Sequence, residues 1–419
     1  MNAQLPIAPL DHNDPAVMRA RADLMAYVFQ FPRVDEQQLA GMVEQHDAGD
    51  RTSMAYDGGQ AVASFRSFDT TLSVPGGGSV PANGVTGVVV LPTHKRRGLL
   101  TRWITADADA AKARGAVASV LYASETGIYR RFGYGVATAH ASATLDVTRA
   151  NFIENPTGSV RIVAGAEALD VLPEVGRRTR QVVAGSIEPT PFQWRVATGQ
   201  TRWHRKQESD LWFAVHRDEA GRPDGVVGYS VTSDWHGGKG DSVVNIHLLH
   251  AACPQAEREL WRHCASVDFA STVRCRLATP DNELRWWVTD QRAVASDTIV
   301  DGLWVRIHDV PAALSARHYS ASGQVVVEVR DSGNHAEGTY RLMVDESGAG
   351  QCMPYPGADA DLTLDVADLG SLWLGGGAGV PTLGTLLRSG RATLADPTCL
   401  PRLTAVFGWP VPARSLTHF

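Results

Sequence analysis

Residues 88–101 read VVVLPTHKRRGLLT, in which an apolar run is followed by a basic turn and then by further apolar residues. The apolar run begins at Val85 and is typical of a buried central strand. Periodic apolar residues over 97–114 predict a helix that Gly115 ends, and residues 116–122 predict a second buried strand. This order predicts a parallel strand pair with a right-handed crossover, and a binding crevice at the carboxyl ends of the strands.

The basic turn has the chemistry of a phosphate site. The first N–H groups of a helix have no partner within the helix and carry partial positive charge, and Gly98 lets the backbone approach a pyrophosphate closely. The side chains of Lys95, Arg96 and Arg97 add positive charge. Neither G-x-G-x-x-G nor G-x-x-x-x-G-K-[ST] occurs in the chain, which argues against Rossmann and P-loop sites. The alternative is a solvated basic loop that caps a helix.

A second motif, SETGIYRRFGYG, follows the second strand at residues 124–135. Its tyrosine, Tyr129, lies on a short expected helix. A phenol has an ordinary pKa of about 10, so it stays protonated at neutral pH and can act as a general acid. An aromatic core residue is the alternative interpretation of the same spacing.

Together the two motifs resemble the GNAT acetyltransferase superfamily, and within it the enhanced-intracellular-survival (Eis) aminoglycoside acetyltransferases. The resemblance implies that the pantetheine arm of acetyl-CoA lies along the strand and that its pyrophosphate lies on the turn. Family members commonly carry arginine at the position of Lys95, so no bidentate phosphate contact is expected there. The residues that the resemblance assigns to acetyl-CoA are Val88, Val89, Val90, Lys95, Arg96, Arg97, Gly98, Leu99, Leu100, Thr101, Ser124 and Glu125.

The same resemblance assigns the catalytic acid and base. Tyr129 would protonate the departing thiolate, and the terminal carboxylate of Phe419 would accept the amine proton, because chains of this family end in phenylalanine and return that carboxylate to the first domain. A free α-carboxyl has a pKa of about 3.5, so useful basicity requires burial. The tail WPVPARSLTHF contains two prolines and an aromatic end, which is compatible with an ordered tail, although a disordered end is the alternative.

The whole chain predicts an α/β (α+β) protein of three packed domains. Residues 1–150 would form the catalytic GNAT domain, and residues 151–298 a second GNAT-like domain that lacks a basic glycine loop and therefore a cofactor site. Residues 299–419 resemble a sterol-carrier-like α+β domain, through LWVRIHDVPAAL and ADLTLDVADLGSLWLGG. That domain would supply the C-terminal carboxylate.

Composition excludes several other classes of function. The net charge of -6 provides no basic excess for nucleic acid. The five cysteines include no C-x-x-C pair, and His247 and His250 fall on opposite faces of an expected strand, so no metal is predicted. No apolar run approaches the roughly 18 residues of a membrane span, and the start MNAQLPIAPLDHND does not have the layout of a signal peptide. We therefore expect a cytoplasmic protein without nucleic-acid or membrane partners.

The expected function is direct transfer of acetyl from acetyl-CoA to a primary amine of an aminoglycoside-like polycation or of a lysine side chain. The resemblance also implies a homo-oligomer, a hexamer in this family. Two alternatives stay open. One is a noncatalytic protein that binds acyl-CoA or a hydrophobic ligand, and the other is an acyltransferase that uses a different acyl donor.

Overall fold

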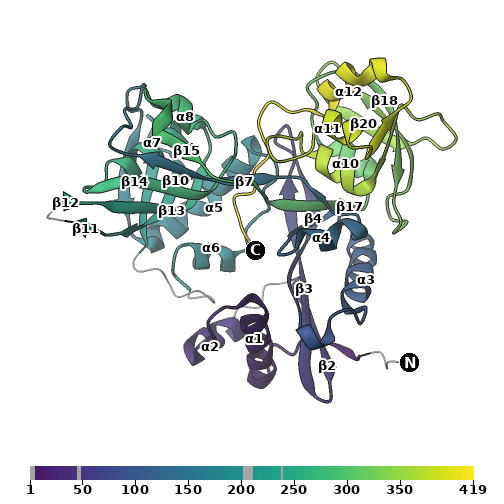
Figure 1. The fold of residues 1–419 in the computed structure, drawn as a ribbon, viewed down its shortest axis with the longest axis horizontal. Coiled ribbons are helices and arrows are strands. Elements are labelled where there is room, and N and C mark those ends of the chain that lie inside the picture. The colour runs from purple at the N-terminus through teal and green to yellow at the C-terminus, as the bar shows by residue number, and fades with distance from the viewer. Residues whose placement is uncertain (1–4, 45–48, 202–210, 237–238) are drawn as a thin grey trace.

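The computed structural model describes residues 5–44, 49–201, 211–236 and 239–419. The first four residues, on which part of the expectation about the start of the chain depends, lie outside these ranges. Sheets of seven, eight and five strands divide the described chain, and each is covered by helices (Figure 1). A two-stranded ribbon of β11 (Trp235–His236) and β12 (Lys239–Gly240) projects from the second sheet.

The first sheet has the order β1-β2-β3-β4-β5-β17-β6. Its strands are β1 (Ile7–Pro9), β2 (Arg51–Asp57), β3 (Gln60–Ser73), β4 (Ser79–Val90), β5 (Ala118–Tyr122), β6 (Gly135–Val136) and β17 (Leu303–Ile307). The helical elements beside it are α1 (Pro15–Phe29), α2 (Glu36–Glu44), η1 (Pro92–His94), α3 (Leu99–Ala113), α4 (Thr126–Tyr129) and η2 (Arg130–Phe132). β4 and β5 pair in parallel on either side of α3, which confirms the expected crossover unit.

The second sheet has the order β15-β7-β14-β13-β10-β9-β8, with β16 paired to β7. Its strands are β7 (Ala139–Asp146), β8 (Ser159–Val163), β9 (Trp212–Arg217), β10 (Pro223–Thr232), β13 (Ser242–Ala251), β14 (Ala270–Ala278), β15 (Val294–Ser296) and β16 (Val300–Asp301). Its helical elements are α5 (Gly165–Val182), α6 (Pro191–Ala197), α7 (Pro254–Ala265), α8 (Leu284–Trp287) and η3 (Gln291–Ala293). β13, α7 and β14 repeat the crossover unit of the first sheet, with β13 and β14 parallel.

The third sheet has the order β20-β19-β18-β21-β22. Its strands are β18 (Gly323–Arg330), β19 (Gly338–Val344), β20 (Gly350–Pro354), β21 (Leu362–Asp365) and β22 (Ala392–Leu394). Its helical elements are α9 (Val310–Ala316), α10 (Val366–Trp373), α11 (Leu383–Arg388), η4 (Pro397–Cys399) and α12 (Leu400–Phe407). The buried core of this part is continuous with residues of β4, β5 and β17, so it packs directly against the first sheet.

The sheets do not follow the expected divisions at 150 and 298. β7 lies before residue 150 but belongs to the second sheet, and β17 lies after residue 298 but belongs to the first. All five residues of β17 are buried, and the strand pairs with β5 on one side and β6 on the other. An apolar strand of this kind can occupy the centre of any sheet, so its position in the chain does not reveal its partners.

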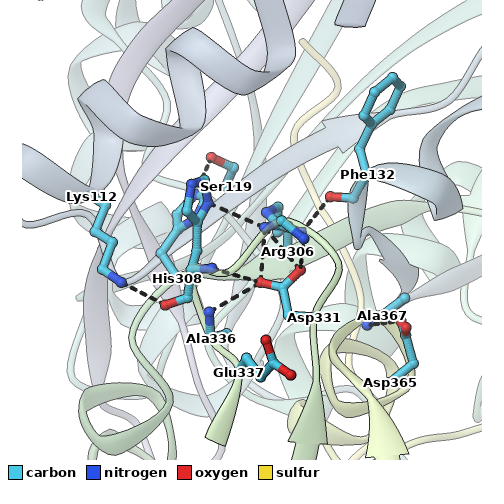
Figure 2. Close-up of polar contacts among 12 residues, drawn as sticks. Lys112, Ser119, Phe132, Arg306, His308, Asp331, Ala336, Glu337, Asp365 and Ala367 are labelled. Carbon is cyan, nitrogen blue, oxygen red and sulfur yellow. Dashed lines mark hydrogen bonds and ion pairs between the residues drawn. The ribbon is translucent and has the colours of Figure 1, made fainter.

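Buried charges fix β17 and the loop after it (Figure 2). Arg306, which is 3% exposed, forms an ion pair with Asp331 at 3.0 Å and donates to the Phe132 carbonyl at 2.5 Å. His308 lies just after β17, and its Nε2 is 2.7 Å from the Ser119 hydroxyl of β5. Asp331 also accepts hydrogen bonds from the backbone N–H groups of Gly333, His335 and Ala336. These contacts connect the third sheet to the loop that follows Tyr129.

Candidate active site

The two strands of the crossover unit separate at their carboxyl ends. β4 pairs with β5 only over Ala82–Val85, so residues 86–90 of β4 have no partner in β5. On the other edge, Val89 and Val90 stay paired with β3. A bulge with Gly87 at a φ of 57° interrupts that ladder within the separated stretch, just before Val88. One edge of Val88–Val90 is therefore free of a neighbouring strand in the described structure, and could pair with an extended amide chain.

The basic turn has the backbone of an anion cradle. Arg96 and Gly98 have φ angles of 63° and 77°, in the left-handed region, and α3 begins at the next residue. A Cβ added to Gly98 would meet no atom within 4 Å, so the space beside it is open. Because Leu99, Leu100 and Thr101 form the first turn of α3, their N–H groups have no acceptor within the helix. The turn therefore fits a pyrophosphate.

The side chains of the turn reach the second motif. Lys95 Nζ lies 3.7 Å from Glu125 Oε1, across the gap between the two strands, and Arg97 lies 3.4 Å from the carboxylate of Asp57. Arg96, Thr101 and Ser124 are exposed. Leu99 is buried and Leu100 is half-buried, so Leu99 can contribute to a ligand site only through its backbone. The structure thus brings the two predicted motifs to one end of the sheet.

Tyr129 ends α4 and is only 5% exposed. Burial, together with the charge of Glu125, raises the pKa of Tyr129 to about 12. The phenol is therefore protonated over the whole physiological range, as a proton donor must be. Its ring packs edge-to-face on Tyr134 at 6.1 Å, which fixes its plane.

The loop after Tyr129 is held by α10 of the third domain, a contact that no sequence motif predicts. Arg130 donates two hydrogen bonds, of 3.0 and 2.8 Å, to the fully buried Asp368 of α10, which also pairs with Arg391. A Cβ on Gly135 would lie 1.7 Å from the carbonyl oxygen of Ala367, so only glycine fits there. A cavity of about 340 Å³ lies in this junction, away from the separated strands. It is lined by Arg130, Arg131, Gly133, Asp331, Ser332, Asp365 and Val366.

The chain ends in the middle of the molecule, between the first and second sheets (Figure 1). The ring of Phe419 packs edge-to-face on Tyr122 and on Phe68, each at 5.3 Å. Tyr122 is the last residue of β5, and its hydroxyl donates to the Thr417 carbonyl at 3.1 Å. The terminal residue therefore lies at the carboxyl end of β5, four residues before α4 begins in the chain at Thr126.

Three family models together cover most of the chain. An acetyltransferase (GNAT) domain matches residues 14–137, a second acetyltransferase (GNAT) domain matches 185–307, and a sterol carrier protein domain matches 310–414. These matches confirm the predicted order of domains, with two GNAT domains followed by one sterol-carrier-like domain. The first match ends before β7 and the second includes β17, so both differ from the expected divisions.

Relatives match this chain over most of its length. An uncharacterized N-acetyltransferase of Streptomyces avermitilis is 38% identical over 87% of this chain and 89% of its own length. N-acetyltransferase Eis of Mycobacterium tuberculosis is 31% identical over 86% of this chain and 87% of its own length. The chain belongs to the Eis family of GNAT N-acetyltransferases. The crystal structure of Eis1 from Mycobacterium abscessus superposes on it with a TM-score of 0.83 and 29% identity, over 99% of this chain and 100% of that one.

Membership of the Eis family makes the chain an N-acetyltransferase, and the noncatalytic alternative is set aside. GNAT acetyltransferases use acetyl-CoA as acyl donor. In the part of the chain that the structure describes, no group of His, Cys, Asp and Glu side chains could hold a metal ion. No helix in the described ranges is long and apolar enough to cross a membrane.

Proposed function

We propose that this Eis-family protein transfers the acetyl group of acetyl-CoA directly to a primary amine, with Tyr129 as general acid and the Phe419 carboxylate as general base. The observation that carries the proposal is the end of β5, where the tail packs on Tyr122 and the second motif begins. Acid, base and cofactor crevice would then meet at one end of the first sheet.

The cofactor would be held mainly by backbone groups. Val88, Val89 and Val90 offer the free edge of β4 to the pantetheine amides, and Arg96 to Thr101 offer the N–H groups of the turn and of α3 to the pyrophosphate. Arg96 and Arg97 add positive charge, while Lys95 shares its charge with Glu125. Ser124 and Glu125 would flank the pantetheine arm from the β5 side.

Acetyl-CoA supplies an acetyl group already activated as a thioester. The Phe419 carboxylate accepts a proton from the amine nitrogen as the N–C bond forms and the C–S bond breaks. Tyr129 donates its phenolic proton to the sulfur, and a proton from solvent later restores it. In this proposal, free N–H groups at the end of β4 would donate to the thioester carbonyl oxygen as negative charge develops.

We propose an aminoglycoside-like polycation as substrate, with lysine side chains as a second class, on the basis of family resemblance and the net charge of -6. An acyl donor other than acetyl is the alternative, since the assigned residues contact the part common to all CoA thioesters. We also propose a cytoplasmic homo-hexamer. The five cysteines, all without disulfide partners, support a reducing compartment.

The test changes acid and base separately. Tyr129→Phe, or one alanine added after Phe419, should lower kcat by about tenfold or more, the usual scale for losing a general acid or base. The dissociation constant of acetyl-CoA should stay near that of the unaltered protein, because neither change touches the cradle. Thiol release with aminoglycosides, polyamines and lysine peptides measures kcat, and calorimetry measures CoA binding. Unchanged kcat in both variants would rule out this acid–base pair.

A further inference from the structure

The second GNAT domain has a strand separation like that at the proposed cofactor crevice of the first. β13 pairs with β14 only as far as Ile246, and residues 247–251 of β13 continue toward α7 paired with β10 but not with β14. In the first domain, residues 86–90 of β4 run on in the same way toward α3. The turn from β13 into α7 consists of Ala252 and Cys253, so there is no basic glycine loop to bind a pyrophosphate.

The C-terminal tail places an arginine at the start of α7. Arg414 donates two hydrogen bonds, of 3.0 and 2.6 Å, to the carboxylate of Glu257 in the first turns of α7. Burial lowers the pKa of His250, on the part of β13 that has no partner in β14, to about 3, and the charge of Arg414 adds to this effect. Arg414 therefore binds the start of α7, the position that corresponds to the basic turn and the start of α3 in the first domain.

The Arg414–Glu257 pair is buried and closely matched. The two side chains are 14% and 11% exposed. Burial alone would lower the pKa of Arg414, but Glu257 more than offsets it and raises the pKa above its ordinary value. A bidentate arginine–carboxylate pair fixes orientation as well as distance. The pair therefore fixes one point of the tail, five residues before the terminus.

Hydrogen bonds of the tail backbone connect Arg414 to the first domain. The Arg414 N–H donates to the Ala184 carbonyl at 2.9 Å. The Ser186 hydroxyl donates to the Arg414 carbonyl at 2.8 Å and accepts from the Leu416 N–H at 3.2 Å. The backbone of Ser186 is in turn bound to Ser73 of β3. The tail is thus held continuously from α7 to Tyr122, where Phe419 packs.

We propose that the second GNAT domain positions the catalytic base, by holding Arg414 at the start of α7, the position that corresponds to the basic turn and the start of α3 in the first domain. Arg414 and Glu257 are positioning residues, and neither touches the reacting atoms. The inference rests on the proposed function, because it requires the Phe419 carboxylate to be the base. It gives the second domain a role in catalysis although it lacks the basic loop for a cofactor.

The first experiment compares kcat in two backgrounds. Glu257→Gln, Arg414→Gln and the double variant are made in the natural chain and in the chain with one alanine added after Phe419. Asp290→Asn, which removes the exposed Arg149–Asp290 pair of the same domain, is the matched control. We call the Arg414–Glu257 pair the clamp. In the natural chain we expect each of its three variants to lower kcat by about tenfold or more, because the base is misplaced. KM for acetyl-CoA should stay nearly unchanged. Asp290→Asn should have no effect.

The second background separates positioning from general stability. Once the added alanine has displaced the carboxylate, Glu257→Gln should lower kcat no further, whereas a merely structural defect would lower it again. An equal loss of kcat in both backgrounds would contradict the positioning role of the clamp but not the role of Phe419 as base. The same conclusion would follow if Glu257→Gln had a normal kcat while the extended chain had a low one. A normal kcat for the extended chain would show that the Phe419 carboxylate is not the base, and the positioning role of the clamp would then also be ruled out.

A readout independent of activity follows the tail itself. Release of Phe419 by carboxypeptidase A, measured by mass spectrometry, should be at least about tenfold faster in Glu257→Gln, since proteolysis follows the population of the open state. Arg414→Lys keeps the charge but not the bidentate geometry and should be intermediate. The double variant leaves no unpaired buried charge, so fast release from it would show a loosened tail rather than a damaged fold. Release at the unaltered rate from all three variants would overturn the proposal.

Discussion

At the scale of single residues, the backbone conformation of the basic turn, which is the proposed pyrophosphate site, depends on one glycine. Gly98 has a φ of 77° and open space where a Cβ would be, so alanine there would be strained and would also project into the cradle. We predict that Gly98→Ala costs about 1–2 kcal/mol of stability and weakens acetyl-CoA binding by about tenfold. Thermal unfolding and calorimetry measure the two effects.

Gly115 provides a matched control at the other end of α3. It has a φ of 84° and no atom within 4 Å of an added Cβ, so Gly115→Ala should cost similar stability. It lies far along the helix from the turn and should leave acetyl-CoA affinity unchanged. If the two variants bound acetyl-CoA equally tightly, the turn would not be the cradle.

The positions of residues in short local motifs could be predicted, and Phe419 could be assigned through family resemblance, whereas the residues that hold these parts through distant contacts could not be predicted. The basic turn and Tyr129 belong to short motifs whose backbone geometry follows from a strand, a turn and a helix N-terminus. Glu257 and Arg414 are 157 positions apart, and each in isolation is an ordinary surface-type residue. The same holds for Arg130 and Asp368, since neither neighbouring sequence indicates the partner.

At the scale of elements, helices and strands follow the sequence closely, whereas their assignment to sheets does not. The strands β4 and β5 and the helix α3 between them form where apolar periodicity predicts them. Such signals act over a few residues. The pairing of β17 with β5 depends on nonlocal packing of two apolar strands, which periodicity does not encode.

The contact between β17 and β5 should make stability depend on pH. Burial, aided by Arg306 and His335, lowers the pKa of His308 to about 3 in the folded protein. Between that value and the unfolded value of about 6.5, the unfolded chain binds the extra proton. The contribution of His308 is therefore complete above about pH 6.5 and is lost as pH falls, by up to about 1.4 kcal/mol per pH unit.

Replacing His308 with a group that cannot titrate tests this assignment. His308→Gln can keep a hydrogen bond to the Ser119 hydroxyl through its amide. We expect the free energy of unfolding in urea to fall less steeply for this variant between about pH 6.5 and about 4 than for the unaltered protein. Parallel slopes would show that His308 is not the titrating group.

At the scale of the whole molecule, the three domains share strands and a continuous core, so we expect them not to fold as independent units. β17 lies at the end of the second GNAT match but completes the first sheet, and β7 follows directly after the first GNAT match and joins the second sheet. The tail then returns from the third domain across the second to the first. The proposed cofactor crevice, acid and base therefore involve segments from all three domains.

Two truncations separate the structural role of β17 from the proposed catalytic role of the tail, residues 408–419. A fragment of residues 1–298 lacks β17, so β5 would lose its partner along all five residues and expose a buried edge. We predict that this fragment is insoluble or loses near-ultraviolet circular dichroism, and binds no acetyl-CoA. A chain ending at Phe407, after α12, keeps β17 and should fold and bind acetyl-CoA with near-normal affinity, but with kcat lower by about tenfold or more because the base is gone. A soluble fragment 1–298 that bound acetyl-CoA as tightly as the full chain would show that the first sheet does not need β17.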